Sequence, residues 1–443
     1  MDAVTQRLWE LDRRSLWHPF TRHSAMDGDP FPIISRGEGV YLYDTDGHRY
    51  VDAISSWWTC NLGHSHPRLV EAIRRQAGQL QHSILGNLSH PLAAELAAEL
   101  TSLFPDDRRR VLFASDGACA VEASLRVAIQ YWHNIGQPQR RRFVALQGGY
   151  HGDTWGAMSL GYVSAFHTAC KHLTLPVLRA DAPCCAGCAW GQTPDSCALE
   201  CLENMRSLVE QHGHEIAAVI VEPLCQGAAG MRLYSAAYLR QLRPLCDQHG
   251  ILLIADEIAM GMGRTGRMFA FEHAEIDPDI VCLGKGLTGG YLPMSATVVK
   301  QYIHETFADT PEDHTFYHGH TFAGNPLAAA AARECLHVYR EEGIVQRAAQ
   351  MGEILKEEMQ IFRDTPATAN LRCQGMIAAI DLDDVTRCHH VRQALLRKGI
   401  LLRPLGNVIY LMLPLTTPEH VLRETVATLH QAIATQERPR PGR

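Results

Sequence analysis

Between about residue 110 and residue 290, short apolar runs alternate with segments of helical periodicity. The runs are four or five residues long and rich in branched side chains, which is typical of parallel strands buried on both faces. Their spacing of roughly 30 residues leaves room for a crossover helix between most of them. The pattern predicts an α/β protein with a doubly wound, mostly parallel central sheet. The predicted strands are residues 111–114, 143–146, 217–221, 251–254 and 280–283.

Each predicted strand runs into a glycine-rich segment that carries polar side chains. Ligands of open α/β sheets bind beyond the carboxyl ends of the strands, so these segments should line one crevice. In chain order they read SDGA, QGGYHGD, EPLCQGAAG, ADEIAMGMGRTG and GKGLTGG.

The remaining chain flanks this pattern on both sides. The N-terminal part contains the aromatic clusters WHPFT and SSWWTC, and the C-terminal part mixes charged helical patterns with apolar runs at 377–380 and 408–413. We predict a large domain over 66–329 and a smaller α+β domain built from 1–65 and 330–443. No repeat or low-complexity tract interrupts this division.

Composition excludes several classes of protein. With 443 residues, 46% hydrophobic residues and a net charge of −7, the chain is of ordinary globular type and long enough for two or three domains. Acidic and basic residues are interspersed along the chain, so no nucleic-acid partner is expected. The arginine runs 108–110 and 140–142 are predicted to be solvated loop charges. No stretch could cross a bilayer and the N-terminus has no apolar signal core, so we expect no membrane contact and a cytoplasmic location.

The turn at 115–118 is the first candidate for ligand chemistry. It ends a strand and opens a helix predicted over 119–133, whose apolar positions follow helical spacing. Free N–H groups and the positive end of the dipole at such a turn suit a phosphate monoester, although many similar turns bind nothing.

Asp256 and Glu257 come directly after the fourth predicted strand. A carboxylate at a buried strand end is costly unless a cation or a hydrogen-bond donor meets it. Two interpretations remain open for Asp256: a structural ion pair with an arginine such as Arg264, or contact with a cofactor.

Lys285 ends the next predicted strand, between Gly284 and Gly286. A desolvated lysine loses its proton readily, and the neutral amine is the nucleophile that forms a Schiff base. The flanking glycines predict backbone turns that other residues resist and space for a bulky adduct. A phosphate turn, an acidic strand end and this lysine together meet the needs of pyridoxal phosphate.

Three other motifs resemble a dinucleotide site or metal sites. Gly261, Gly263 and Gly266 match the dinucleotide pattern G-x-G-x-x-G of an NAD-dependent oxidoreductase, but the first glycine does not directly follow the strand. The cysteines of the 184–201 segment have paired spacing, but the pairs are closer together than in a zinc ribbon. With fourteen cysteines and no secretory signal, free thiols are expected. The segment HTFYHGH lacks a carboxylate at a supporting spacing, so no metal site is predicted there.

Taken together, the chain resembles the class III pyridoxal-phosphate aminotransferases over essentially its whole length. The motifs that carry the resemblance are WHPFT, SSWW, GYHGDTWGAMS, ILLIADEIAMGMGRTGRMFA, CLGKGLTGG and HGHTFAGNPLA. The resemblance implies a fold-type I transferase that binds pyridoxal 5'-phosphate. It is strongest to the biotin-pathway branch, which aminates 8-amino-7-oxononanoate to 7,8-diaminononanoate.

The resemblance also implies roles for individual residues. Lys285 is similar to the imine lysine, Asp256 to the partner of the pyridine nitrogen and Tyr150 to the aromatic that stacks on the ring, and these three are the expected catalytic residues. Trp57 and Trp58 resemble the wall of the substrate cleft, and Arg403 resembles the guanidinium that pairs with the substrate carboxylate. The expected cofactor-binding residues are Gly117, Ala118, Tyr150, Asp256, Ile258, Lys285, His320 and Thr321, and the expected substrate residues are Phe20, Trp57, Trp58, Asp153, Gly319 and Arg403.

Donor and assembly follow from the same resemblance. S-adenosylmethionine is the expected amino donor, and L-lysine stays open because Phe20 and the HGH motif are similar to the lysine-using branch. His320 and Thr321 resemble a loop lent to the partner's phosphate site, which implies a homodimer with shared active sites. Alternatives are another class III ω-amino-acid transaminase, or a protein that holds pyridoxal phosphate without turnover.

Overall fold

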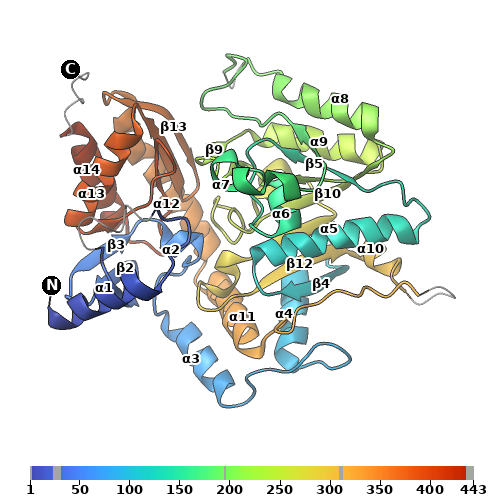
Figure 1. Ribbon diagram of the computed structural model, residues 1–443, viewed down its shortest axis with the longest axis horizontal. Coiled ribbons are helices and arrows are strands. Elements are labelled where there is room, and N and C mark those ends of the chain that lie inside the picture. The colour runs from blue at the N-terminus through green and yellow to red at the C-terminus, as the bar shows by residue number, and fades with distance from the viewer. Residues whose placement is uncertain (1, 23–30, 194–195, 309–312, 436–443) are drawn as a thin grey trace.

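A seven-stranded sheet forms the centre of the protein in the computed structural model, which describes residues 2–22, 31–193, 196–308 and 313–435 (Figure 1). All neighbouring strands are parallel except that β12 runs antiparallel to both of its neighbours. The fold is therefore the predicted α/β type with a mostly parallel sheet. In spatial order the strands are β4 (Arg109–Ala114), β12 (Ser295–Lys300), β11 (Ile280–Leu283), β10 (Leu252–Asp256), β7 (Ile216–Val221), β5 (Arg142–Leu146) and β6 (Val177–Ala180).

All five predicted strands are confirmed, and two strands were missed. Four of the five predicted strands are buried along nearly every residue, as in β7, whereas β4 is half-buried at Val111 and Leu112. Of the two missed strands, β12 is buried at five of its six residues but contains Ser295 and Thr297, while β6 lies at the edge of the sheet and only its last residue is buried. An edge strand needs no continuous apolar run, so its pattern gives a weaker signal.

Helices cover both faces of the sheet. Alternate residues of β7 face opposite sides: Ala218 and Ile220 pack with α5, whereas Val219 and Val221 pack with α8 and α9. The helix predicted over 119–133 is confirmed as α5. The bounds are α5 (Gly117–Asn134), α6 (Trp155–Leu160), α8 (Glu203–His212), α9 (Ala236–Gln248), α10 (Gln301–Glu305), α3 (Pro67–Ala77), α4 (Pro91–Thr101) and α11 (Pro326–Glu341).

Segments from both ends of the chain meet in a four-stranded sheet, where β15 of the C-terminal part pairs in parallel with β3 of the N-terminal part. Helices α1, α13 and α14 lie together on the left of Figure 1, apart from α5, α8 and α9. The predicted division into 66–329 and the two terminal segments stays a prediction, and residues 1, 23–30 and 436–443 of those segments lie outside the described residues. The bounds are α1 (Ala3–Ser15), β1 (Ile34–Glu38), β2 (Tyr41–Asp44), β3 (Arg49–Asp52), α12 (Ile344–Glu358), β13 (Thr368–Gln374), β14 (Ile377–Leu382), α13 (Val385–Arg397), β15 (Ile400–Leu401), β16 (Val408–Leu411) and α14 (Glu419–Ala434).

Short elements complete the described chain. They are α2 (Ser55–Trp58), α7 (Ser164–His167), β8 (Cys225–Gln226) and β9 (Arg232–Leu233), with the 3-10 helices η2 (Thr168–Leu173), η3 (Glu200–Leu202), η4 (Ala270–Ala274), η5 (Lys285–Thr288) and η6 (Met359–Arg363). No helix among the described residues is long and apolar enough to span a bilayer.

The prediction that both arginine runs are solvated is wrong for Arg109 and Arg140, whereas Arg108, Arg110 and Arg141 are exposed as predicted. Arg109 begins β4, is 2% exposed, forms an ion pair with Asp277 and donates to Pro278 O at 3.3 Å. Arg140 donates to the backbone oxygens of Gly213 and Ile216 at 2.9 and 3.1 Å. Each guanidinium supplies several donors to carbonyls where chain segments meet, a role that sequence spacing does not reveal.

Candidate active site

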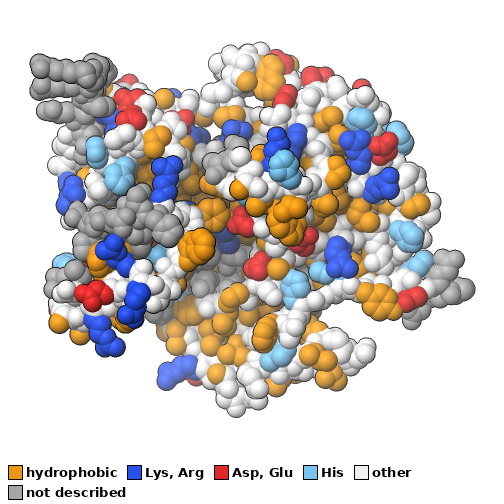
Figure 2. Space-filling view, viewed as in Figure 1, with side chains coloured by type: hydrophobic (Ala, Val, Ile, Leu, Met, Phe, Trp, Pro, Cys, Tyr) orange, Lys and Arg blue, Asp and Glu red, His pale blue; other side chains and the backbone are white. Residues whose placement is uncertain are grey.

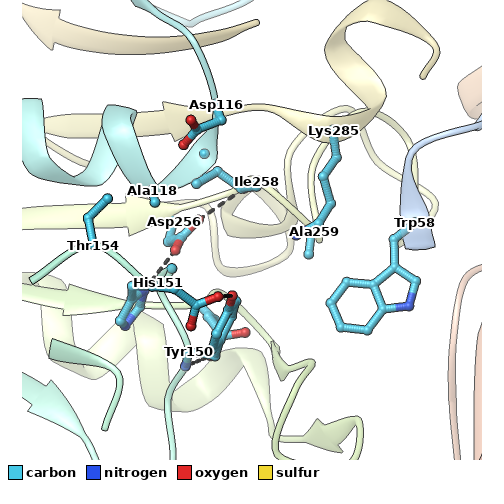
Figure 3. Close-up of a pocket in the computed structure, with 14 residues that line it drawn as sticks. Trp58, Asp116, Ala118, Tyr150, His151, Thr154, Asp256, Ile258, Ala259 and Lys285 are labelled. Carbon is cyan, nitrogen blue, oxygen red and sulfur yellow. Dashed lines mark hydrogen bonds and ion pairs between the residues drawn. The ribbon is translucent and has the colours of Figure 1, made fainter. Parts of the chain in front are cut away.

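Strand register brings Lys285 and Asp256 into one cavity. Asp256 is the last residue of β10 and pairs with Cys282 of β11, and Lys285 follows just beyond the end of β11. Both side chains line a cavity of about 490 Å³, together with Trp58, Tyr150 and others. Figure 3 shows Lys285 extending into this space, with Asp256 and Tyr150 on one side and Trp58 on the other. The predicted crevice at the carboxyl ends of the strands is therefore present.

The two glycines beside Lys285 do not act as predicted. Gly284 has an extended φ of −173°, and the left-handed residue is Lys285 itself, with φ 43°. A Cβ on Gly286 would lie 2.4 Å from Asn61 Nδ2, and one on Gly284 would lie 3.3 Å from Ile258 Cγ2. Close packing, and not a turn, requires the glycines here. The backbone strain rests on the lysine, as is common for residues at functional sites.

Asp256 is held by a histidine and not by an arginine. Its Oδ2 lies 2.7 Å from His151 Nδ1, and its Oδ1 accepts a hydrogen bond from Ile258 N at 3.1 Å. The alternative ion pair with Arg264 is wrong, because Arg264 donates to Leu413 O and Asn61 Oδ1 at 2.5 and 2.7 Å. Glu257 points elsewhere and accepts from the N–H groups of Ala270 and Phe271, both at 2.9 Å.

Burial shifts the pKa values of two ionisable side chains that line the cavity. It lowers the pKa of Lys285, although the negative charges of Asp256 and Glu222 oppose this. Burial likewise raises the pKa of Glu222 to about 7. A lysine with a lowered pKa offers a neutral amine, which is the reactive form.

Glu222 was missed by sequence reasoning. It is 6% exposed, lines the cavity, and accepts hydrogen bonds from Tyr150 N at 3.0 Å and Gly227 N at 2.9 Å. Its position just after β7 was a usable signal, because it is a carboxylate at a buried strand end just as Asp256 is.

The predicted phosphate turn opens α5 on the same cavity. Asp116 is the N-cap and its side chain accepts from Cys119 N at 3.1 Å, while the N–H groups of Gly117 and Ala118 come first in the helix and so have no carbonyl partner within it. A Cβ at position 117 would lie 2.9 Å from Ile258 Cγ2, so the turn requires glycine. Gly117, Ala118 and Ile258 all line the cavity as expected.

Tyr150 lies between the cavity that contains Lys285 and a second, adjoining cavity. Its hydroxyl donates to Asp153 Oδ2 at 2.8 Å, and Asp153 Oδ1 lies 3.1 Å from His167 Nε2. Burial and the bond to Asp153 raise the pKa of Tyr150, so its hydroxyl keeps its proton at neutral pH. Asp153 therefore orients the tyrosine from the rim of the cavity.

A second cavity of about 510 Å³ adjoins the first, and five of its twelve lining residues are aromatic. The Arg403 guanidinium lies 4.4 Å from the Trp57 ring centroid and 5.8 Å from that of Phe20, and it donates to Phe20 O at 3.4 Å. No carboxylate of the described chain forms an ion pair with it. Figure 2 shows a hollow on this face, bordered by hydrophobic and charged side chains.

Two further residues shape this cleft. Phe166, which sequence reasoning missed, packs edge-on against Phe20 with ring centroids 5.2 Å apart. Trp58 lines both cavities, and its ring centroid lies 5.0 Å from Lys285 Nζ. The predicted residues Phe20, Trp57, Trp58 and Arg403 thus come together from distant parts of the chain.

Three predicted residues lie outside both cavities. Gly319 and Thr321 are exposed, and His320 Nδ1 is 3.4 Å from Ser115 Oγ. Their predicted contacts with substrate and phosphate are not made within a single chain, so their roles stay predictions.

Among the residues that the structure describes, the glycine motif at 261–266 and the candidate metal motifs do not form the sites that their sequences resemble. The segment with Gly261, Gly263 and Gly266 forms turns after β10 and opens no α-helix, so it lacks the strand-to-helix geometry of a dinucleotide site. All fourteen cysteines are free thiols. Within the described part of the chain, no three His, Cys, Asp or Glu residues are grouped so that they could hold a metal ion.

Comparison with known proteins supports one family. The model of the class III aminotransferases matches residues 23–433. The chain is 43% identical to the adenosylmethionine-8-amino-7-oxononanoate aminotransferase of Nitratidesulfovibrio vulgaris, over 97% of this chain and 82% of the relative. It is 37% identical to the enzyme of the same name from Geobacter sulfurreducens, over 98% of this chain and 99% of the relative.

Solved structures give the same result. The crystal structure of adenosylmethionine-8-amino-7-oxononanoate aminotransferase from Methanocaldococcus jannaschii is similar with a TM-score of 0.91 and 35% identity, covering 97% of this chain and 98% of that one. A PLP-bound amine transaminase from an uncultivated Pseudomonas species has a TM-score of 0.90 and 34% identity, covering 95% of this chain and 98% of that one.

Proposed function

The chain belongs to the class III aminotransferases, and on that premise we propose that it transfers an amino group from S-adenosylmethionine to 8-amino-7-oxononanoate, giving 7,8-diaminononanoate for biotin synthesis. The observation that carries the proposal is the pairing of a lysine cavity with an aromatic cleft that ends in Arg403. Such a cleft suits an acceptor with an apolar chain and a terminal carboxylate. The relatives named for this reaction match nearly all of the chain.

The cavity residues fit pyridoxal phosphate. An α-helix begins at Gly117 with N–H groups free for a phosphate, and a side chain at that position would collide with Ile258. Asp256 supplies an anion for the pyridine nitrogen, and Lys285 supplies the amine for covalent attachment. Bound there, pyridoxal phosphate supplies a ring that withdraws electrons from the substrate carbon.

Lys285 is the proposed proton carrier. Its Nζ, whose pKa is lowered by burial, would serve as a neutral base that takes a proton from the substrate carbon and delivers it to the cofactor carbon. Trp58 lies beside Nζ at 5.0 Å and keeps water from that side. The lysine is therefore a nucleophile first and a general acid–base catalyst second.

Asp256 and His151 form the proposed pair that would hold the pyridine nitrogen of the cofactor. The 2.7 Å contact with His151 Nδ1 fixes the carboxylate, which would keep the pyridine nitrogen of a bound cofactor protonated. Tyr150, held by Asp153, provides the aromatic face for stacking. Arg403, Trp57 and Phe20 orient the acceptor and take no part in proton transfer.

The proposal includes a homodimer in which each chain lends His320, Thr321 and Gly319 to the partner's site. What supports it is the exposure of large apolar side chains on the segment that carries these residues and near the cavity: Ile84 is 51% exposed, Leu88 59%, Trp155 53% and Phe322 62%. Contiguous apolar exposure marks interaction surfaces. L-lysine as donor, or another ω-amino acid as substrate, is the alternative within the same chemistry.

The decisive experiment omits the acceptor. Purified yellow protein is mixed with S-adenosylmethionine or with L-lysine, and absorbance reports conversion of the cofactor to its aminated form. We expect conversion with S-adenosylmethionine; conversion with L-lysine alone assigns the other donor. If neither amine converts the cofactor, the biotin-pathway assignment is wrong, and if the protein cannot be reconstituted with pyridoxal phosphate, the role of Lys285 is wrong too.

A further inference from the structure

The segment that carries both cleft tryptophans has a left-handed backbone. Ser55, Ser56, Trp57 and Trp58 have φ values of 47°, 45°, 66° and 72°, and none of them is glycine. A left-handed conformation is strained for an L-residue because its Cβ comes too close to the following carbonyl oxygen. Four such residues in a row persist only where their surroundings hold them. The wall of the acceptor cleft is thus built on a strained turn that needs an anchor.

Asp52 is the anchor on one side of this turn. Its Oδ2 accepts from Ser56 Oγ at 2.7 Å and lies 2.9 Å from His64 Nε2, and its Oδ1 lies 3.3 Å from Ile54 N. The Asp52 and His64 side chains are only 2% and 12% exposed. A buried carboxylate with a cationic partner and further donors is strongly fixed in place, and loss of one partner leaves an uncompensated charge.

The C-terminal part of the chain anchors the other side. Ser55 Oγ donates to Met412 O at 2.6 Å, and Trp58 Nε1 donates to Tyr410 OH at 3.2 Å. Arg264 Nη2 lies 3.4 Å from Ser55 Oγ. These bonds fix the ends of the turn, whereas Ser56, which directly precedes Trp57, is bonded through its side chain to Asp52.

We propose that Asp52 and His64 are positioning residues for the acceptor: their ion pair holds the left-handed turn so that Trp57 stays stacked on Arg403 and Trp58 stays beside Lys285. The inference rests on the proposed function in that the cleft is taken to receive the oxo-acid. Neither residue lines a cavity, so their action is indirect and falls on acceptor binding.

The pair also makes the turn sensitive to pH. Burial alone would lower the pKa of His64, but the hydrogen bond and charge of Asp52, with a further contribution from Cys60, raise it to about 9. Arg264 and Tyr410 are the other titratable groups whose charge acts on or is acted on by Asp52. Because the folded pKa lies above the ordinary value of 6.5, the stabilisation is complete below about pH 6.5 and is lost as the pH rises through about 9.

Three variants separate the charge from the hydrogen bond. His64→Gln retains a donor to Asp52 without the charge, His64→Ala removes both, and Ser56→Ala removes the neighbouring donor while leaving the buried pair. The matched control is His48→Ala, since His48 also pairs with an aspartate, Asp44, at 3.1 Å, but on the β2–β3 turn away from the cleft.

Two measurements are made on each variant. For His64→Ala and Ser56→Ala we expect the acceptor KM to rise about ten-fold, with the donor half-reaction at saturating donor within two-fold of wild type. Near-ultraviolet circular dichroism is recorded on the cofactor-free protein, and the signal of Trp57 is identified as the part that Trp57→Phe removes. As the pH rises, this signal should change in wild type with a midpoint near pH 9, whereas His64→Gln should show no such change.

The proposal is overturned if His64→Ala and Ser56→Ala leave both the acceptor KM and the tryptophan signal unchanged, or if His48→Ala shifts them equally. Persistence of the pH step in His64→Gln also overturns it. A protein that uses no oxo-acid would refute the proposed function instead, and the tryptophan signal of the cofactor-free variants would still decide whether the ion pair holds the turn.

Discussion

The lysine cavity and the aromatic cleft touch, yet they are built in opposite ways. Lys285, Asp256 and Glu222 come from the ends of neighbouring strands of one sheet; Asp256 and Glu222 are buried and Lys285 is half-buried. Phe20, Trp57 and Arg403 come from the two ends of the chain; Phe20 is 41% exposed and Trp57 is 37% exposed. The cavity is therefore held by sheet register, whereas the cleft depends on how distant segments dock and on a strained turn.

This difference separates chemistry from selectivity. Desolvation adjusts the proton affinities of Lys285 and Glu222, which only a buried site can do. The cleft instead offers a stacked guanidinium and aromatic walls, which select a ligand by shape and terminal charge. Changes in the cavity should consequently abolish turnover, and changes in the cleft should alter which substrates are used.

Lys285→Ala should have the largest effect, because it removes both the covalent attachment and the proton carrier. We expect amino transfer to fall by about 10³-fold or more, with the cofactor bound only non-covalently. Loss of the imine absorbance and single-turnover rates with donor measure this. The matched control is Lys300→Ala, another lysine at the end of a strand of the same sheet. A covalent adduct that survives in Lys285→Ala contradicts the assignment.

Asp256→Asn comes next. It keeps the shape of the side chain but removes the anion that faces His151, so we expect the donor half-reaction to slow by about 10²-fold with little change in donor KM. Asp279→Asn is the comparison, since Asp279 is also buried beside the sheet but pairs with Arg243 at 2.7 Å. If the donor half-reaction, corrected for the fraction of folded protein, slows equally in both variants, the Asp256 carboxylate has no specific role in the chemistry.

Glu222→Gln tests whether burial controls protonation. The pKa of Glu222 is raised from 4.5 to about 7, so the folded protein retains a proton that the unfolded chain releases, and stability falls as the pH rises through this window. Between pH 5 and 8, the free energy of unfolding of the cofactor-free variant should improve relative to wild type by about 3 kcal/mol. Exposed Glu203→Gln should show no such change, and an equal pH slope for Glu222→Gln and wild type would disprove the shift.

Arg403→Ala should act on the acceptor alone. Loss of a charged pair to the carboxylate should raise the acceptor KM by about 10- to 100-fold, while donor half-reaction rates stay within two-fold. Arg397→Ala, which changes an exposed charge at the end of α13, provides the control. Equal losses in both half-reactions would refute a role specific to the carboxylate.

Phe20→Tyr should have the smallest effect. A hydroxyl added at the rim of the cleft gives the donor a hydrogen-bonding partner, so we expect the preference for S-adenosylmethionine over L-lysine to increase about five-fold. Phe166→Tyr adds the same group across the 5.2 Å aromatic contact and tests whether position matters. An unchanged ratio of kcat/KM for the two donors would show that Phe20 does not set donor choice.

Sequence reasoning was most accurate where one local pattern decides the structure. Apolar runs followed by Asp256 or by Gly-Lys285-Gly predicted the strands, their burial in the sheet and the common crevice at their ends. Sequence reasoning failed for Arg109, whose burial depends on a partner far along the chain. It also failed for the glycines beside Lys285, which are required because a Cβ there would crowd Asn61 and Ile258. Phe166 and His151 carried no pattern that pointed to their partners.

The sequence by itself determined the fold class, the turn that opens α5, the lysine at a strand end and its acidic neighbour, because these follow from periodicity and from residues adjacent to a strand end. Only the tertiary structure decided that His151 faces Asp256, that Lys285 bears the left-handed backbone, and that Asp52 contacts both His64 and Ser56 beside the tryptophans. Such contacts join residues distant along the chain, and their energies depend on burial and distance, which exist only after the chain has folded.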